Sequence, residues 1–239
     1  MVSSPFFSFS LCRSPYHLIT FPQLSAYSPP FDDLTKNLEQ VKLEYIAMAN
    51  IVEDKIYGWV QGKDARETRV AIYTSIRDIP YAVIPELNDP ERYMEVLKLN
   101  RGSCTPKHLL LCRMYQQIGL EVLYVVYPFR WDEVEAIYPP ELKKLARAMP
   151  VGYHLACKVD VDGKFILVDA TLDLALHKIG LPVNREWDGI GDTFLAVNPC
   201  GEEELYHPSE AYLMQHSTDS EKTLAFYNGL NLWLEQLRG

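Results

Sequence analysis

The sequence has no concentration of positive charge. Its 23 lysines and arginines are outnumbered by 32 aspartates and glutamates, which gives a formal net charge of −9 over 239 residues. Proteins that bind nucleic acid rely on clustered Lys and Arg side chains. The short basic stretch KKLAR at 143–147 fits a solvated helix face, so we expect no nucleic-acid partner.

Long apolar runs are also missing. No stretch reaches the roughly 18 consecutive apolar residues of a membrane-spanning helix, so no membrane partner is predicted. Residues 1–30 are rich in Ser, Pro and aromatic residues, but they lack the basic start and continuous apolar core of a signal peptide. We expect a poorly defined extension at 1–30, followed by one domain at 31–239. The oligomeric state stays open.

Cysteine is scarce, and several nucleotide and metal motifs are absent. Five irregularly spaced cysteines, an odd number, argue against a disulfide framework and favour reduced thiols in the cytoplasm. Neither GxGxxG, GxxxxGK[ST] nor GxSxG occurs, which excludes the usual phosphate loops and the serine-hydrolase elbow.

A zinc site on one helix is the remaining metal hypothesis. Cys104, His108 and Cys112 recur every four residues and share a helix face. They would extend over about 12 Å of helix axis, too far for three ligands of one ion. We therefore expect no metal and no cofactor, with Cys112 in the core and His108 near the surface.

The pattern of apolar residues predicts helices first and hairpins later, which is typical of an α+β domain. Asp162-Gly163 is the strongest hairpin signal. Gly229 is expected to interrupt the last helix. The predicted elements are helices at 33–49, within 64–78, after Asp89-Pro90, from Cys104 to Gly119, at 141–148 and within 220–239, a strand at 121–127, and the hairpin around 162–163.

Cys104 lies in a small polar turn where an amphipathic helix begins. It follows Gly102 and Ser103 and precedes Pro106, a residue tolerated in the first helical turn. The N–H groups and dipole of a helix N-terminus favour a thiolate over a thiol. Cys104 is therefore a candidate nucleophile, the alternative being a small residue packed at a helix start.

The Asp162-Gly163 turn brings a histidine and a carboxylate together. A two-residue loop pairs His154 with Thr171 and places Asp169 diagonally opposite His154 on the same face. Diagonal neighbours lie roughly 7–8 Å apart at the backbone, within reach of an imidazole and a carboxylate. The alternative is a surface cross-strand pair.

The same sheet face carries apolar residues between the polar ones. Ala156 lies on the His154 strand, and Phe165 and Leu167 lie on the returning strand. A wholly solvated face has no need of them, so the pattern favours the floor of a cleft.

These motifs together resemble the transglutaminase-like superfamily of papain-like cysteine enzymes. GSC at 102–104 opens a helix, and YHLACKVDVDGKFILVDAT at 153–171 supplies a His at a strand start and an Asp in a DGxWxxxDxT-type return strand. The resemblance covers about 101–173. It implies a papain-like or transglutaminase-like α+β fold, with N-terminal helices and a nucleophile at a helix start packed on an antiparallel sheet.

The resemblance implies Cys104 as nucleophile, His154 as general base and acid, and Asp169 as the orienting carboxylate. The sequence departs from the family at Phe165, where the family has Trp, and at Ala156, where an aromatic residue is common. An insertion around 130–150 also lengthens the gap from Cys to His. The insertion and the missing aromatic residue are both expected to border the cleft, which leaves substrate preference open.

The chemistry implied is acyl transfer from an amide bond of a peptide, a protein or a small amide. The backbone N–H of Cys104 and the side chain of Tyr81 are the candidate oxyanion donors. Water as acceptor makes the protein a protease or amidase, and an amine makes it a transglutaminase. Hydrolysis is the simpler prediction for a chain without visible accessory domains. The alternative is a catalytically silent binding or scaffold module with a residual triad.

Overall fold

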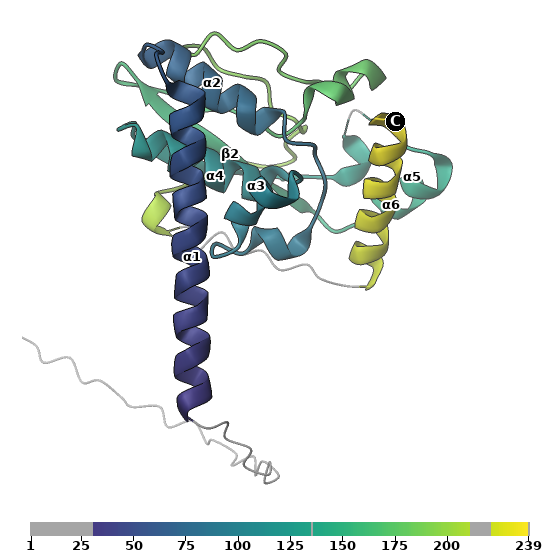
Figure 1. The fold of residues 1–239 in the computed structure, drawn as a ribbon. Helices are drawn as coiled ribbons and strands as arrows, with labels where there is room; N and C mark the ends of the chain where they lie inside the picture. The colour runs from purple at the N-terminus through teal and green to yellow at the C-terminus, as the bar shows by residue number, and fades with distance from the viewer. Residues whose placement is uncertain (1–30, 135, 211–220, 239) are drawn as a thin grey trace, which may run out of the picture. The chain divides into compact units, whose positions relative to one another are not determined.

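The computed structural model describes residues 31–134, 136–210 and 221–238 (Figure 1). The predicted extension at 1–30 lies outside the described residues. The chain divides into two compact units, Met1–Gln40 and Val41–Gly239. In the first unit the described residues, 31–40, are helical. All the strands and the residues discussed below belong to the second.

Most of the described helices precede the first strand in the chain. Its elements are α1 (Phe31–Val60), α2 (Ala65–Arg77), the 3-10 turns η1 (Pro85–Asn88) and η2 (Tyr93–Glu95), α3 (Val96–Leu99), α4 (Cys104–Gln117), β1 (Val122–Phe129), η3 (Trp131–Glu133), α5 (Pro140–Arg147), β2 (Gly152–Val161), β3 (Lys164–Val168), η4 (Leu174–Ile179), β4 (Glu204–Tyr206) and α6 (Glu221–Arg238).

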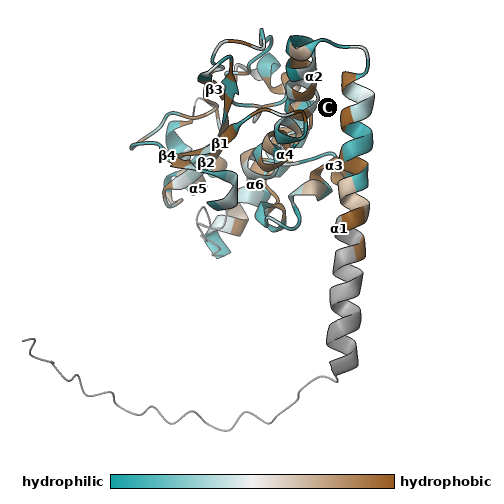
Figure 2. Cartoon of the chain, turned by 90° about the vertical axis from the view of Figure 1, so that its left-hand side faces the viewer, coloured by the Kyte–Doolittle hydropathy of each residue, from teal (hydrophilic) through white to brown (hydrophobic). Residues whose placement is uncertain are grey.

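The four strands form one antiparallel sheet in the order β3-β2-β1-β4. The α+β class is confirmed. β1 lies inside the sheet, and its apolar, brown ribbon in Figure 2 matches a strand that is buried along most of its length. A strand that is covered on both faces needs an apolar residue at almost every position, because the side chains on both faces are buried.

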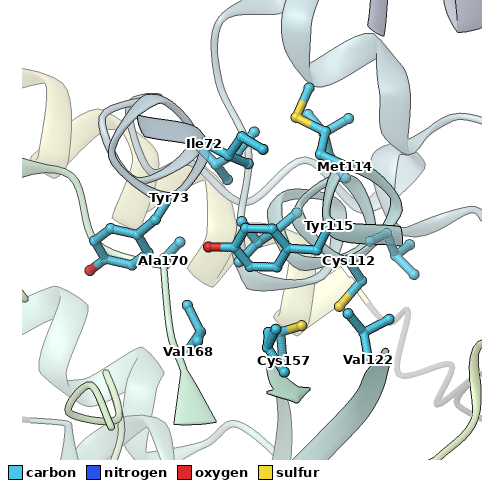
Figure 3. Packing of buried hydrophobic residues seen from close by; sticks show 14 of the residues in the cluster. Ile72, Tyr73, Cys112, Met114, Tyr115, Val122, Cys157, Val168 and Ala170 are labelled. Carbon is cyan, nitrogen blue, oxygen red and sulfur yellow. The ribbon is translucent and has the colours of Figure 1, made fainter. Parts of the chain in front are cut away.

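The main core lies between α2, α4 and the sheet. Cys112 of α4 is fully buried and points toward Cys157 of β2 (Figure 3). Met114 of α4 is fully buried on the side of the helix that faces away from the strands, and Tyr73 of α2 is buried beside Ala170. Each large apolar side chain buried in this way contributes about 1.5–3 kcal/mol. The packing fixes α4 on the sheet, and with it the position of Cys104 at the helix start.

Three predicted helices differ from the structure. α1 continues beyond 49 because Val52 and Ile56 extend its buried stripe. The segment after Pro90 forms a 3-10 turn and the short α3 instead of one helix. Gly229 does not interrupt α6. A Cβ at Gly229 would lie 3.3 Å from Leu142 of α5, so this glycine allows the two helices to approach closely.

Other predicted elements are confirmed. α2 begins at a capping box between Asp64 and Glu67, and it ends at Arg77. α4 starts at Cys104, and Gly119 adopts the left-handed conformation just beyond its end. Among the described helices, none combines the length and apolarity needed to cross a membrane.

Candidate active site

The turn before α4 is held rigidly, and it fixes where Cys104 begins the helix. The Gly102 N–H donates to the Pro80 carbonyl oxygen, and the Gly102 carbonyl oxygen accepts the Ala82 N–H, both at 3.2 Å. A Cβ at Gly102 would lie 2.5 Å from Cγ2 of Val96, so only glycine fits there. The glycine of the GSC motif is therefore required by close packing.

His154 and Asp169 meet, although not by the strand pairing that the sequence predicts. The register around Asp162-Gly163 is confirmed, but the β2–β3 ladder ends at Cys157 and Val168. The predicted His154–Thr171 pair is wrong because Asp169 turns away from the ladder: its N–H donates to Thr193 Oγ1 at 2.7 Å. The His154 imidazole nonetheless lies with Nε2 2.8 Å from Asp169 Oδ2.

The Asp169 carboxylate is buried among hydrogen-bond donors. Besides His154, it accepts the N–H of Thr171 at 2.9 Å and the N–H of Ala196 at 2.8 Å. Burial alone would raise the pKa of Asp169, but the charge and hydrogen bond of His154 outweigh it and hold this pKa well below its usual range. Asp169 is a fixed negative charge.

The environment of His154 favours its protonated, positively charged form. Burial acts to lower its pKa, but the charge and hydrogen bond of Asp169, followed by its interaction with Cys104, raise this pKa to about 10. Since Nε2 is bound to Asp169, Nδ1 is the ring nitrogen that remains for the thiol. An imidazole oriented in this way by a carboxylate is what a general base requires.

Cys104 is half-buried, and its thiolate is favoured. Burial acts to raise the pKa of Cys104, but the hydrogen bond and charge of His154, with the Leu155 N–H, bring it below its ordinary value. Its sulfur also lies 4.0 Å from Thr105 Oγ1. Both shifts favour a Cys104 thiolate beside a His154 imidazolium.

His108 is fully buried behind Cys104, although it is predicted from the sequence to lie near the surface. That prediction is wrong because both ring nitrogens find partners inside: Nδ1 lies 2.8 Å from the Cys104 carbonyl oxygen, and Nε2 accepts the Ala170 N–H at 2.9 Å. Burial lowers the pKa of His108 to about 4, so the ring stays neutral with its proton on Nδ1. Residues four positions apart are neighbours on a helix, so the spacing of His108 from Cys104 indicates this contact in the sequence.

A metal would need ligands that the described part of the chain does not gather. Among these residues, no group of three or more His, Cys, Asp or Glu side chains is placed to hold an ion. Both nitrogens of His108 are already hydrogen-bonded, and Cys112 lies in the core.

Cys104 and His154 open into a cavity of about 450 Å³. Tyr81 lies in the same wall, so the structure brings this candidate oxyanion donor to the site. Its backbone N–H donates to Asp173 Oδ2 at 2.8 Å. Burial first, and then the charge of Cys104, raise the pKa of Tyr81 well above its usual value. The phenol therefore stays protonated beside the thiol.

The insertion borders the cavity as predicted, through Trp131, Val134 and Tyr138. α6 forms a second part of the cavity wall, through Leu230 and Trp233, which was not predicted from the sequence. The helical periodicity of this segment indicated a buried stripe, but nothing local indicates that it faces Cys104.

The predicted cleft floor is wrong in detail. Ala156 is fully buried in a small cluster with Val125 and Tyr127, and Leu167 and Leu195 pack against it. The segment around Leu195 covers this face of the sheet. The face therefore carries apolar residues because it is buried under that segment. The cavity instead lies beside the first residues of β2, where His154 is.

Comparisons with known proteins return structures only. No family model and no curated protein matches this chain. A solved structure named "Crystal structure of a TGase" is similar with 13% identity and a TM-score of 0.41, over 61% of this chain and 39% of that one. The "Putative Cysteine Protease from Cytophaga hutchinsonii" is similar with 15% identity and a TM-score of 0.37, over 54% and 39%.

The chain therefore spans about two fifths of the length of both structures. Because both TM-scores lie below 0.5, the functional argument below rests on the geometry of this chain alone.

Proposed function

We propose that the protein is a cysteine-dependent hydrolase of amide bonds, with Cys104 as nucleophile, His154 as general base and acid, and Asp169 as the orienting carboxylate. One observation carries the proposal: His154 is bound to the buried Asp169 and favours the Cys104 thiolate in the wall of a cavity. A structural role alone does not require a nucleophile, a base and its orienting group together.

The reaction proceeds in two steps. The Cys104 thiolate attacks the carbonyl carbon and forms a C–S bond, while the carbonyl electrons move to oxygen. The imidazolium of His154 then protonates the leaving amine as the C–N bond breaks, leaving a thioester. Next, His154 takes a proton from water, which attacks the thioester and releases a carboxylic acid and the Cys104 thiol, whose proton returns to His154.

The oxyanion of each tetrahedral intermediate needs hydrogen-bond donors. The Cys104 N–H at the start of α4 has no acceptor within its own helix. The protonated Tyr81 phenol, in the same cavity wall, is the proposed second donor. Hydrolysis is proposed over transfer to an amine because water needs no second substrate site.

The test uses p-nitrophenyl acetate as a small activated acyl donor. We expect the wild type to release more than one equivalent of nitrophenol, with the acetyl group trapped on the Cys104 peptide on rapid quenching. Cys104→Ser should lower turnover about 10²-fold or more. Cys200→Ser, at an exposed cysteine, should leave it unchanged. Acetylation of Cys200 without turnover would favour the scaffold alternative.

A further inference from the structure

The cavity beside Cys104 is built mainly from aromatic and aliphatic side chains. Trp131 and Tyr138 come from the segment between β1 and α5, Trp233 and Leu230 from α6, and Leu176 from η4. None of these residues is needed for the acyl-transfer steps. Their common feature is a large apolar surface facing the space next to the thiol.

The walls are held in place by ring contacts. Trp131 packs against Phe226 with ring centroids 5.0 Å apart, and Tyr138 packs against Trp233 at 5.4 Å. Such tilted and edge-on pairs stabilise fixed ring orientations. The cavity is therefore formed before a ligand arrives, and a volume of about 450 Å³ is much larger than a reacting amide alone requires.

Charge is almost absent from these walls. Apart from Cys104 and His154, the only charged residue among the described ones that line the cavity is Asp89, which is exposed. No lysine or arginine is among them. A charged group on a ligand would lose its hydration without gaining a partner, which is costly. A neutral apolar group loses little and gains burial.

Thr171 contributes a buried hydroxyl to the wall. It is 3% exposed, its Oγ1 makes no hydrogen bond of full geometry within the described part of the chain, and its hydroxyl interacts with the Asp169 carboxylate. Its backbone is fully engaged, since the N–H donates to Asp169 at 2.9 Å and the carbonyl accepts from Lys107 at 2.7 Å. A buried hydroxyl that makes no hydrogen bond of full geometry gains stability when a ligand supplies a better partner.

We infer that the substrate is an amide carrying a neutral, bulky aromatic or aliphatic group beside its reacting carbon, and that the Thr171 hydroxyl hydrogen-bonds a polar atom of that substrate. The inference rests on the proposed function for the identity of the reacting group. It adds the substrate class and one binding residue, because the cavity selects by apolar size and by the absence of charge.

The test compares alkylation of Cys104 by iodoacetamide, 2-iodo-N-benzylacetamide and the anionic 2-iodo-N-(carboxymethyl)acetamide. Each rate is divided by the rate at the exposed Cys200 in the same molecule, which corrects for intrinsic reactivity. We expect this ratio to rise about tenfold or more from iodoacetamide to the benzyl reagent. It should fall for the anion. Equal ratios for the three reagents would overturn the inference and leave the proposed function standing.

Thr171→Val and Thr171→Ser separate binding from structure. The valine variant keeps the shape and removes the hydroxyl, so benzyl-reagent alkylation of Cys104 should fall about five- to tenfold. The serine variant should recover it to within about twofold. Unfolding midpoints should fall little in Thr171→Val, because the lost hydroxyl makes no hydrogen bond of full geometry within the described residues. An unchanged alkylation rate in Thr171→Val would overturn the role of Thr171.

A different result would overturn the proposed function instead: iodoacetamide modifying Cys104 no faster than Cys200. The cavity is then tested without chemistry, by titrating unreactive N-benzylacetamide and anionic N-acetylglycine. Binding is followed by tryptophan fluorescence, since Trp131 and Trp233 line the cavity. Preferential binding of N-benzylacetamide supports the inferred ligand class, and equal or absent responses overturn it.

Discussion

Asp169 determines the chemistry of the site at the scale of single residues. Its carboxylate serves His154 and two backbone N–H groups at once. In Asp169→Asn one carboxylate oxygen becomes an NH₂ group, so one of these donors faces another donor. The negative charge that raises the pKa of His154 is also lost.

We predict that Asp169→Asn lowers acyl-transfer turnover about 10²- to 10⁴-fold. It should also lower the free energy of unfolding by about 1–3 kcal/mol, the cost of an unpaired buried polar group. Turnover of the activated ester and urea unfolding measure the two effects. Asp162→Asn, in the exposed hairpin turn where Asn tolerates the positive φ of 55°, is the matched control. Turnover equal to that control would remove Asp169 from the mechanism.

At the scale of elements, Lys107 of α4 ties together three segments around the site. It is fully buried, and its Nζ donates to the carbonyl oxygens of Arg77 and Ile79, both at 2.9 Å, and of Thr171 at 2.7 Å. The end of α2, the segment before Tyr81 and the segment after Asp169 are thereby fixed to the helix that carries Cys104.

Lys107→Met keeps the aliphatic stem and removes all three donors. Each carbonyl left unpaired costs about 1–3 kcal/mol, so we predict a loss of at least about 3 kcal/mol in the free energy of unfolding. Urea unfolding measures it. Lys143→Met, at an exposed position of α5, should change stability by less than about 0.5 kcal/mol. A loss below about 1 kcal/mol in Lys107→Met would show that water or backbone movement replaces the bonds.

Elements set by local geometry are predictable from the sequence, and those set by distant packing are not. The turn residues Asp162 and Gly163 adopt positive φ angles of 55° and 82°, which few residues accept, so the hairpin register follows from the sequence. The burial of His108 and the end of the β2–β3 ladder depend on Ala170 and Thr193, whose positions no local pattern encodes.

The cavity is the clearest case of information missing from local sequence. Leu230 and Trp233 lie more than a hundred residues beyond Cys104 in the chain, and the packing of α6 against α5 and η4, with the hydrogen bonds of Asn231 to the Val83 backbone, brings them to it. The order of Cys, His and Asp along the sequence, in contrast, reflects helix and strand starts that local patterns define.

At the scale of the whole molecule, two histidines shape the dependence of stability on pH. The folded-state pKa of His108 is lowered from 6.5 to about 4, so the unfolded chain binds more protons between these values and stability falls as pH drops through this window. The pKa of His154 is raised to about 10, so its contribution is complete below about 6.5 and is lost as pH rises toward 10. Burial lowers the pKa of Lys107 from 10.5 to about 7, so stability rises with pH between these values and offsets the loss through His154.

We therefore predict that the free energy of unfolding falls by up to about 3 kcal/mol as pH drops from about 6.5 to 4, through His108. Below about pH 4 the lowered pKa of Asp169 adds a further loss. Urea unfolding across this range measures the curve. His108→Asn should flatten the slope between about pH 6.5 and 4, whereas His177→Gln, at an exposed histidine, should not. A wild-type curve flat over that window would contradict the account.

The proposed mechanism requires that His154 and Cys104 form an ion pair in the resting protein. The most direct measurement is the rate of Cys104 alkylation by iodoacetamide across a pH series, mapped by peptide mass spectrometry in the wild type and in His154→Ala. We expect a midpoint well below the pKa of about 8.5 of a free thiol, and a rise of that midpoint in His154→Ala. A wild-type midpoint near 8.5 that the substitution leaves unchanged would contradict the proposed mechanism.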